Sequence, residues 1–173
     1  VVERTDGAAM TQQQQILFAC IDSCCYFKLS GELRYTNASG MDDLVERLFA
    51  SELNCRQLVV DLNDVSFMDS TYIGLLASLA RFCQQQQLPR PTLFSTNSDV
   101  NELLYSLCLE QAFDIVQQAT TAAVELSAVS THDYSEQQHG QMILRAHQAL
   151  IALNDKNKAA FQPVVDLLKQ QLK

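Results

Sequence analysis

The segment from residue 58 to residue 85 constrains the fold of this chain most. Leu58-Val59-Val60-Asp61-Leu62 is a short, nearly continuous apolar run, which is typical of a strand covered on both faces and therefore of a central, often parallel strand. A short loop follows, and a very apolar helix is predicted at Tyr72–Gln85. A buried strand followed directly by a helix indicates an α/β sheet.

Further elements surround this unit. Strands are predicted at 15–22, 26–33, 92–95 and 113–116, and amphipathic helices at 41–49, 98–107 and 119–129. The last of these helices is predicted from an apolar stripe at helical spacing, which consists of Ala119, Ala122, Ala123, Leu126 and Val129. The opening pair of strands forms a hairpin, so we expect a mixed β-sheet with helices packed on it. Right-handed crossovers then put the helices that follow the third and fourth strands on the same face.

The distribution of charge divides the chain. Residues 1–129 carry 16 of the 20 acidic and seven of the 12 basic residues, whereas residues 130–173 carry four and five. The polar segment 130–133 lies at this break and indicates a domain boundary. We therefore expect a disordered or engineered N-terminal segment at 1–13, a compact domain at 14–129 and a helical C-terminal extension at 130–173.

The C-terminal extension carries an apolar stripe at helical spacing. Its members are Ile143, Ala146, Leu150 and Leu153, followed by Phe161, Val164, Val165, Leu168 and Leu172. A polar segment at 154–157 favours a helical hairpin, and Pro163 leaves one long kinked helix as the alternative. The stripe must be covered by its own domain, by a second copy or by a partner, and we expect a homodimer through residues 130–173.

Composition excludes several classes of function. The net charge of −8 disfavours nucleic acids and anionic membranes. The apolar run at 16–21 is too short to span a bilayer, and the N-terminus lacks the basic start of a secretory signal, so we expect a cytoplasmic protein.

The cysteines and histidines indicate neither a metal nor a cofactor site. The six cysteines show no Cys-x-x-Cys spacing, so they are predicted to be mostly buried free thiols, with a redox switch at Cys24-Cys25 as the alternative. His132, His139 and His147 are spaced too far apart along a helix to share one metal ion, and we expect solvated or packing histidines. Asp42 and Asp43 are expected to face solvent.

Asp69, Ser70 and Thr71 form the best candidate site. Three helix-capping residues stand in a row where the apolar helix begins, although one is enough as a cap. The surplus hydroxyls therefore lie at a helix N-terminus, which stabilises negative charge. A phosphate on Ser70 would add about two negative charges at the rim, where a partner could recognise them.

These motifs resemble the STAS-domain family, and within it the anti-sigma-factor antagonists. The resemblance rests on the strand 58–62, on Asp69-Ser70-Thr71 with Ile73-Gly74-Leu75-Leu76 after it, and on Gly31-Glu32-Leu33 upstream. It covers roughly residues 14–129 and implies a STAS-like mixed sheet.

The resemblance also implies roles for single residues. The family's phosphorylated serine falls on Ser70, with Asp69 and Thr71 beside it as supporting residues, and Gly74 matches a helix glycine that we expect to pack closely on the sheet. Tyr72 replaces the family's usual glycine, and Arg34 its frequent aspartate. Tyr72 is predicted to be exposed and, with Asp69, to contact a partner.

The implied function is a bacterial partner-switching protein in transcription regulation, not an enzyme. Unphosphorylated, it would bind an anti-sigma factor or serine-kinase regulator; phosphorylation of Ser70 would break the complex, and a serine phosphatase would restore it. The alternative within the fold is an unphosphorylated STAS subunit of an ABC complex that transports membrane lipids. An enzyme with Ser70 or Cys24-Cys25 as nucleophile is disfavoured because the sequence indicates no nearby histidine base.

Overall fold

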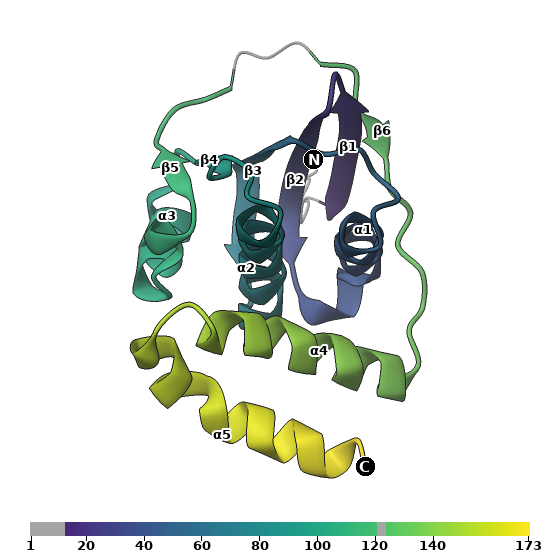
Figure 1. Cartoon of the computed structure of the whole chain (residues 1–173), viewed down its shortest axis with the longest axis vertical. Helices are drawn as coiled ribbons and strands as arrows, with labels where there is room; N and C mark the ends of the chain where they lie inside the picture. Colours follow the sequence, from purple (N-terminus) through teal and green to yellow (C-terminus); the bar gives the residue numbers. More distant parts are fainter. Residues whose placement is uncertain (1–12, 121–123) are drawn as a thin grey trace, which may run out of the picture.

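The computed structural model describes residues 13–120 and 124–173, and its centre is a six-stranded mixed sheet (Figure 1). The strands are β1 (Gln15–Ile21), β2 (Cys24–Leu33), β3 (Gln57–Met68), β4 (Thr92–Phe94), β5 (Asp114–Val116) and β6 (Ser127–Ala128). Their order across the sheet is β5-β4-β3-β2-β1-β6. The strands β2 to β5 are parallel, and β1 pairs antiparallel with both β2 and β6. The predicted mixed α/β fold is confirmed.

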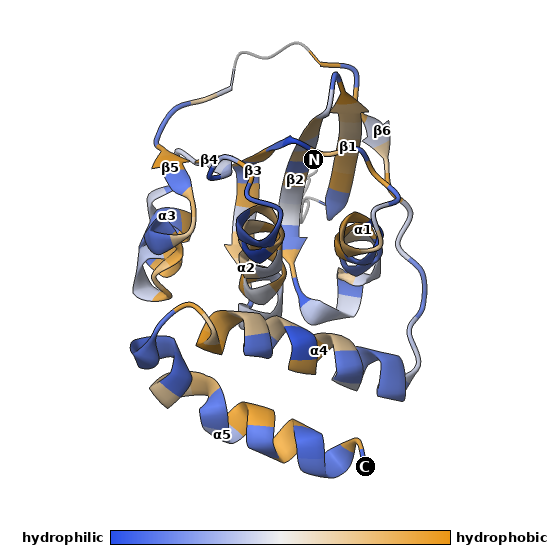
Figure 2. Cartoon of the chain, in the orientation of Figure 1, coloured by the Kyte–Doolittle hydropathy of each residue, from blue (hydrophilic) through white to orange (hydrophobic). Residues whose placement is uncertain are grey.

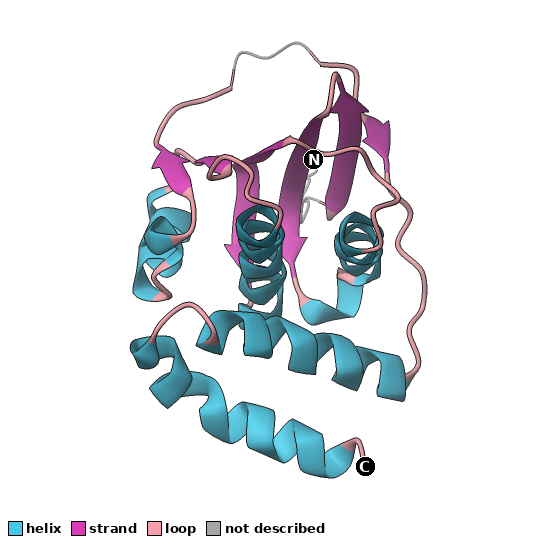
Figure 3. Ribbon diagram, viewed as in Figure 1, coloured by secondary structure: helices cyan, strands magenta, loops and turns pink. Residues whose placement is uncertain are grey.

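Helices cover one face of this sheet. They are α1 (Ser39–Phe49), α2 (Ser70–Gln85) and α3 (Ser98–Ser106), with the short 3-10 helices η1 (Tyr35–Asn37) and η2 (Leu109–Gln111). Figure 3 shows the three α-helices side by side against the strands. Alternate residues of β2, from Cys25 to Leu33, are buried against this layer, as a strand with one covered face requires. The helices that follow β3 and β4 therefore lie on the same face, as the crossover rule predicts.

The C-terminal extension is a helical hairpin, so the hairpin alternative was right. It consists of α4 (Glu136–Ile151) and α5 (Asp155–Gln171). Ser135 caps α4 and Asn154 caps α5, because their side-chain oxygens accept hydrogen bonds from backbone N–H groups of the first turn. Pro163 lies inside α5 without ending it. Figure 1 shows α4 crossing α2 and α5 lying outside α4.

The hairpin docks on its own domain. Met142, Ala146, Ala149 and Leu150 are buried in the same core as α1, α2 and the sheet. The α4 part of the apolar stripe is thus covered without a second copy, and the reason for expecting a homodimer through this part disappears. On α5 only Val165 of the stripe is fully buried, and Val164 remains 38% exposed. Apolar and polar segments alternate along α5 (Figure 2).

Two sequence expectations about local structure were wrong. The helix predicted at 119–129 is not formed in its described part, where Ser127–Ala128 form β6 instead; Ala122 and Ala123 lie outside the described residues. The loop predicted after residue 62 belongs to β3, which continues to Met68 through register irregularities against β2. The expected disordered or engineered segment at 1–13 lies almost wholly outside the described residues.

Candidate functional site

Asp69 fixes the start of α2. It follows the last residue of β3, and its Oδ1 accepts a hydrogen bond from the backbone N–H of Tyr72 at 3.0 Å, as an N-cap does. Its Oδ2 accepts a second bond from the N–H of Tyr35 at 2.6 Å, which ties η1 to the same point. Both carboxylate oxygens are therefore engaged by the chain's own backbone, and Asp69 serves as a structural cap for two segments.

Ser70 is the first residue of α2 and is half-buried. Its Oγ lies 2.9 Å from Nε2 of His147, a residue of α4 that is 4% exposed. The Nδ1 of His147 lies 2.7 Å from the carbonyl oxygen of Ile143. A carbonyl only accepts, so Nδ1 carries the proton; in the neutral ring Nε2 then accepts from the Ser70 hydroxyl. The candidate phosphorylation site is thus hydrogen-bonded to the C-terminal hairpin.

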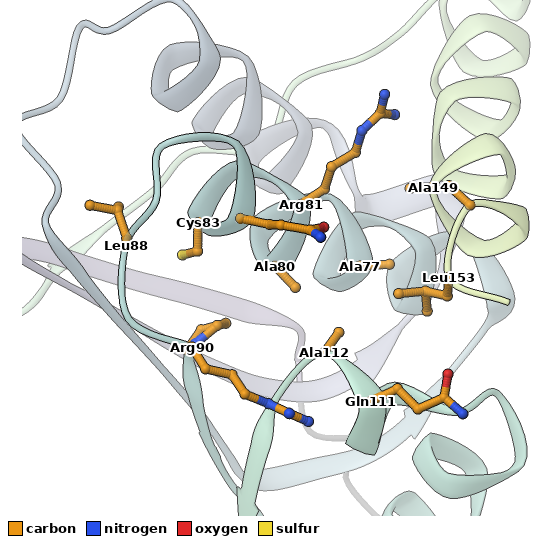
Figure 4. Close-up of a pocket in the computed structure, with 13 residues that line it drawn as sticks. Ala77, Ala80, Arg81, Cys83, Leu88, Arg90, Gln111, Ala112, Ala149 and Leu153 are labelled. Carbon is orange, nitrogen blue, oxygen red and sulfur yellow. The ribbon is translucent and has the colours of Figure 1, made fainter.

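This pair corrects the expectation that no histidine lies near Ser70. A serine whose hydroxyl donates to an oriented histidine has the first two parts of a nucleophilic site. A cavity of about 540 Å³ lies elsewhere (Figure 4). It lies between the later turns of α2, from Ala77 to Gln84, and Ala149 and Leu153 near the end of α4. At about 1.5 Å per residue those turns are about 10–20 Å from Ser70 along the helix, so this cavity offers the pair no substrate site.

Thr71 and Tyr72 are buried. Thr71 is 4% exposed and Tyr72 is fully buried. The Tyr72 hydroxyl donates to the carbonyl oxygen of Asn37 at 3.1 Å and accepts from the side chain of Gln14 at 3.4 Å. Burial raises the pKa of Tyr72 well above its usual range. The prediction that Tyr72 is an exposed contact residue was wrong, because its position in the first turn of α2 turns the ring inward.

Gly74 packs against α4 and not against the sheet. A Cβ built on Gly74 would lie 2.3 Å from the carbonyl oxygen of Ala146. The expected close packing at this glycine exists, but its partner is the C-terminal hairpin.

The exposed aromatic residues near the site are Tyr35 and Phe67, which were not singled out from the sequence. They are 44% and 40% exposed. The guanidinium of Arg34 lies 4.3 Å from the centre of the Phe67 ring, at cation–π distance. Tyr35 meets the ring of His139 edge-on at 5.7 Å. In a regular strand, residues two apart share a face, so Phe67 would be buried like Val65. The register of β3 against β2 is irregular at this point, and Phe67 is exposed instead.

The hairpin is also anchored on α1. Asp42 Oδ2 accepts hydrogen bonds from Arg145 at 2.8 Å and from the hydroxyl of Tyr134 at 2.9 Å. The side chain of Asp42 is only 3% exposed, so the expectation that it faces solvent was wrong, whereas that of Asp43 is 42% exposed. Burial and the bond to Asp42 raise the pKa of Tyr134. Arg145 lies 3.3 Å from Glu46 as well.

The remaining candidate residues are the cysteines and histidines that lie outside the Ser70 site. Within residues 13–120 and 124–173, no three His, Cys, Asp or Glu side chains are grouped to bind an ion. All six cysteines are free thiols. Four of them are buried; Cys24 is intermediate and Cys20 exposed. The Sγ atoms of Cys20 and Cys25, which face each other across β1 and β2, are 3.2 Å apart. None of the described helices has the length and apolar character needed to cross a membrane.

This architecture defines the class to which the protein belongs. The STAS-domain family matches residues 15–123, which is more than half of the chain, and the chain belongs to that family. The match ends before α4 begins.

Two solved structures are similar to this chain. The unphosphorylated anti-sigma factor antagonist SpoIIAA is similar at a TM-score of 0.50 and 17% sequence identity, over 59% of this chain and 87% of that one. An anti-sigma factor antagonist from Mycobacterium paratuberculosis gives a TM-score of 0.47 and 18% identity, over 61% and 87%. A comparison with curated proteins found no match.

Proposed function

We propose that this protein is an anti-sigma factor antagonist controlled by phosphorylation of Ser70. In its unphosphorylated form it binds an anti-sigma factor or a serine-kinase regulator and releases that regulator's target. A serine kinase ends the interaction, and a serine phosphatase restores it. The observation that carries the proposal is the position of Ser70: a half-buried hydroxyl at the first turn of α2, directly after β3 of a STAS fold.

The surroundings of Ser70 support a binding site for a protein. Tyr35 and Phe67 are exposed beside the cap residue Asp69, and Arg34 lies over Phe67. Aromatic and arginine side chains are enriched among the residues that dominate protein interfaces. Thr71, the neighbouring hydroxyl, is 4% exposed, so Ser70 is the better acceptor for a kinase.

Charge explains how phosphorylation would break such a complex. A phosphate adds about −1.5 to −2 charges at neutral pH. At Ser70 this charge would stand next to the carboxylate of Asp69, in a surface that is desolvated when a partner binds. The N-terminus of α2 favours negative charge on the phosphate, whereas an interface that removes water from the phosphate makes partner binding costly. The mechanism is a change in binding, without catalysis.

Two measurements test the proposal. First, the protein isolated from its native cell should carry the mass of one phosphate group, lost on phosphatase treatment and mapped to Ser70. Second, Ser70→Ala should retain the regulator in affinity capture, and Ser70→Asp should lose it. Ser66→Asp is the matched control, since Ser66 is exposed near the end of β3 and receives the same charge.

Two other results would contradict the proposed function. An unmodified Ser70 in cells where the protein is active, together with equal capture by Ser70→Ala and Ser70→Asp, would rule out the switch at this residue. Specific recovery of an ATP-binding-cassette protein by all the variants would favour the lipid-transport alternative. Soluble expression in the cytoplasm of a bacterium is part of the proposal and is checked by fractionation of the same cells.

A further inference from the structure

Helix α4 covers the face of α2 that carries the candidate site. The hydroxyl of Ser70 is bonded to His147 at 2.9 Å, and Gly74, one turn further on, lies under the backbone of Ala146. These two residues of α4 are adjacent in sequence, so one short stretch of the helix closes over the start of α2 (Figure 1). His139, near the beginning of α4, reaches Tyr35.

This arrangement places the buried ring of His147 against the Ser70 hydroxyl. A hydroxyl oxygen 2.9 Å from a ring nitrogen is in hydrogen-bond contact, so a phosphoryl group in place of the hydroxyl proton removes this bond and brings its oxygens close to His147. His147 is itself held between the Ile143 carbonyl and the ring of Phe161, with ring centres 5.4 Å apart. While α4 remains docked, the half-buried Ser70 hydroxyl is engaged by His147, and this face of α2 is covered.

The hairpin is built as a unit of its own. The ring of His147 contacts Phe161 of α5, and Val165 of α5 is fully buried. Gly140 of α4 faces the side chain of Leu172, just beyond α5. These contacts within the hairpin survive if α4 leaves α2. The family match, 15–123, ends before this unit, and the strands β1 to β5 and the helices α1 to α3 lie within that match.

We propose that α4 is a displaceable cover, which occupies in the free protein the surface of α2 that a helix of the regulator binds. The partner is then an amphipathic helix with a small residue opposite Gly74 and a hydrogen-bond acceptor opposite Ser70, as Ala146 and His147 are now. This inference rests on the proposed function, because it concerns how the Ser70 surface becomes available. Regulator binding and phosphorylation both require α4 to move away.

The anchor on α1 offers a way to loosen the cover without disturbing the core. Arg145 is half-exposed and joins α4 to the buried carboxylate of Asp42 at 2.8 Å. Arg145→Glu replaces this attraction with repulsion from Asp42 and Glu46. Lys158→Glu is the matched control, since Lys158 is exposed on α5 and the change in net charge is the same.

The experiment uses the full chain and a fluorescent peptide of residues 134–173, which carries an intact Arg145. The peptide should bind the Arg145→Glu chain about tenfold more tightly than the wild type, equivalent to about 1.4 kcal/mol of weakened docking. The Lys158→Glu chain should behave as the wild type. A peptide with Ala146→Leu, which meets Gly74, should fail to bind either chain.

Hydrogen exchange provides the second readout. In the wild-type chain the α4 amides should exchange before the β3 amides, and in Arg145→Glu earlier still. If α4 and β3 exchange together in both chains and the peptide binds neither, α4 is a permanent layer and the proposal is wrong. Leu150→Asp, which places a charge on a fully buried position of α4, repeats the test with a stronger perturbation, checked for folding by circular dichroism.

Neither readout uses a kinase or a regulator, so failure here is distinct from failure of the proposed function. If α4 is displaceable but Ser70 carries no phosphate in cells, the proposed function is wrong and the displaceable cover is supported. If Ser70 is phosphorylated in cells but α4 stays docked, the proposed function is supported and the displaceable cover is wrong.

Discussion

Gly74→Ala separates two opposing effects at one position. In an ordinary helix interior, alanine in place of glycine stabilises by about 0.8–1 kcal/mol because glycine loses more backbone entropy on folding. In this chain the new Cβ would lie 2.3 Å from the carbonyl oxygen of Ala146 and 2.6 Å from its carbonyl carbon. Both are backbone atoms, so the clash cannot be relieved by a change of side-chain rotamer.

The relative size of the clash and of the gain in helix propensity decides whether Gly74→Ala stabilises or destabilises the protein. Carbon contacts are favourable at about 3.5–4.0 Å, so α4 must move outward by about 1 Å or more. Overpacking of this kind costs about 1–3 kcal/mol. Nearly all of this range is larger than the gain of about 0.8–1 kcal/mol in helix propensity. We expect Gly74→Ala to lower the free energy of unfolding by about 0–2 kcal/mol.

Urea unfolding followed by far-UV circular dichroism measures this change, with Gly140→Ala as the control. A Cβ on Gly140 would lie 3.0 Å from Cδ2 of Leu172, the mobile end of a side chain beyond the last helix. Gly140→Ala should therefore be neutral or stabilise by up to about 1 kcal/mol. If Gly74→Ala raises the unfolding midpoint as much as Gly140→Ala, α4 does not press on α2 and the described packing is refuted.

Three further predictions concern buried side chains. Tyr72→Phe removes the hydrogen bond to Asn37 and should lower the free energy of unfolding by about 0.5–1.5 kcal/mol. Tyr72→Ala also removes the buried ring and should lower it by about 3–5 kcal/mol. Urea unfolding measures both changes, and losses below about 0.5 kcal/mol would place the ring outside the core. Because burial raises the pKa of Tyr72 above its ordinary 10.0, the folded state holds that proton when the unfolded state has lost it. Stability should thus be unaffected by this group below about pH 10 and fall above it by about 1.4 kcal/mol per pH unit, a slope that Tyr72→Phe removes. Iodoacetamide at neutral pH should label exposed Cys20 first and leave Cys83, whose pKa burial raises to about 12, unlabelled until unfolding; diamide should join Cys20 to Cys25, seen by mass spectrometry.

The sequence predicted the strands β1 to β5 and the α-helices because local patterns determine them. The apolar run 58–62 and the capping residue Asp69 are short-range signals, and both elements formed where expected. The extension of β3 to Met68 was missed, since it begins with the polar pair Asn63-Asp64 and its register is irregular against β2. Bulges depend on the partner strand, which a single pattern does not reveal.

The candidate site could be predicted only in part. Ser70 and Asp69 were found from their place at the start of a helix, and Asp69 proved to be the cap. His147, 77 residues further along the chain, has no local signal that links it to Ser70. One signal was available: α2 is apolar on nearly all sides, and a helix of this kind is buried on all sides. That pattern predicts a second covering layer, which α4 supplies.

The position of β6 has a consequence for how the molecule stays apart from its copies. The chain leaves β5 at one edge of the sheet and returns to the other, where Ser127 and Ala128 pair with Phe18 and Leu17 of β1. An uncovered edge strand offers a row of unpaired backbone groups to a neighbouring chain and is an aggregation hazard. A domain cut after residue 129 keeps this short cover on the apolar strand β1, whereas one cut after residue 123 removes it. The hairpin and the strand before it thus protect two different surfaces, and the shorter domain is expected to self-associate through β1 even though its helices are intact.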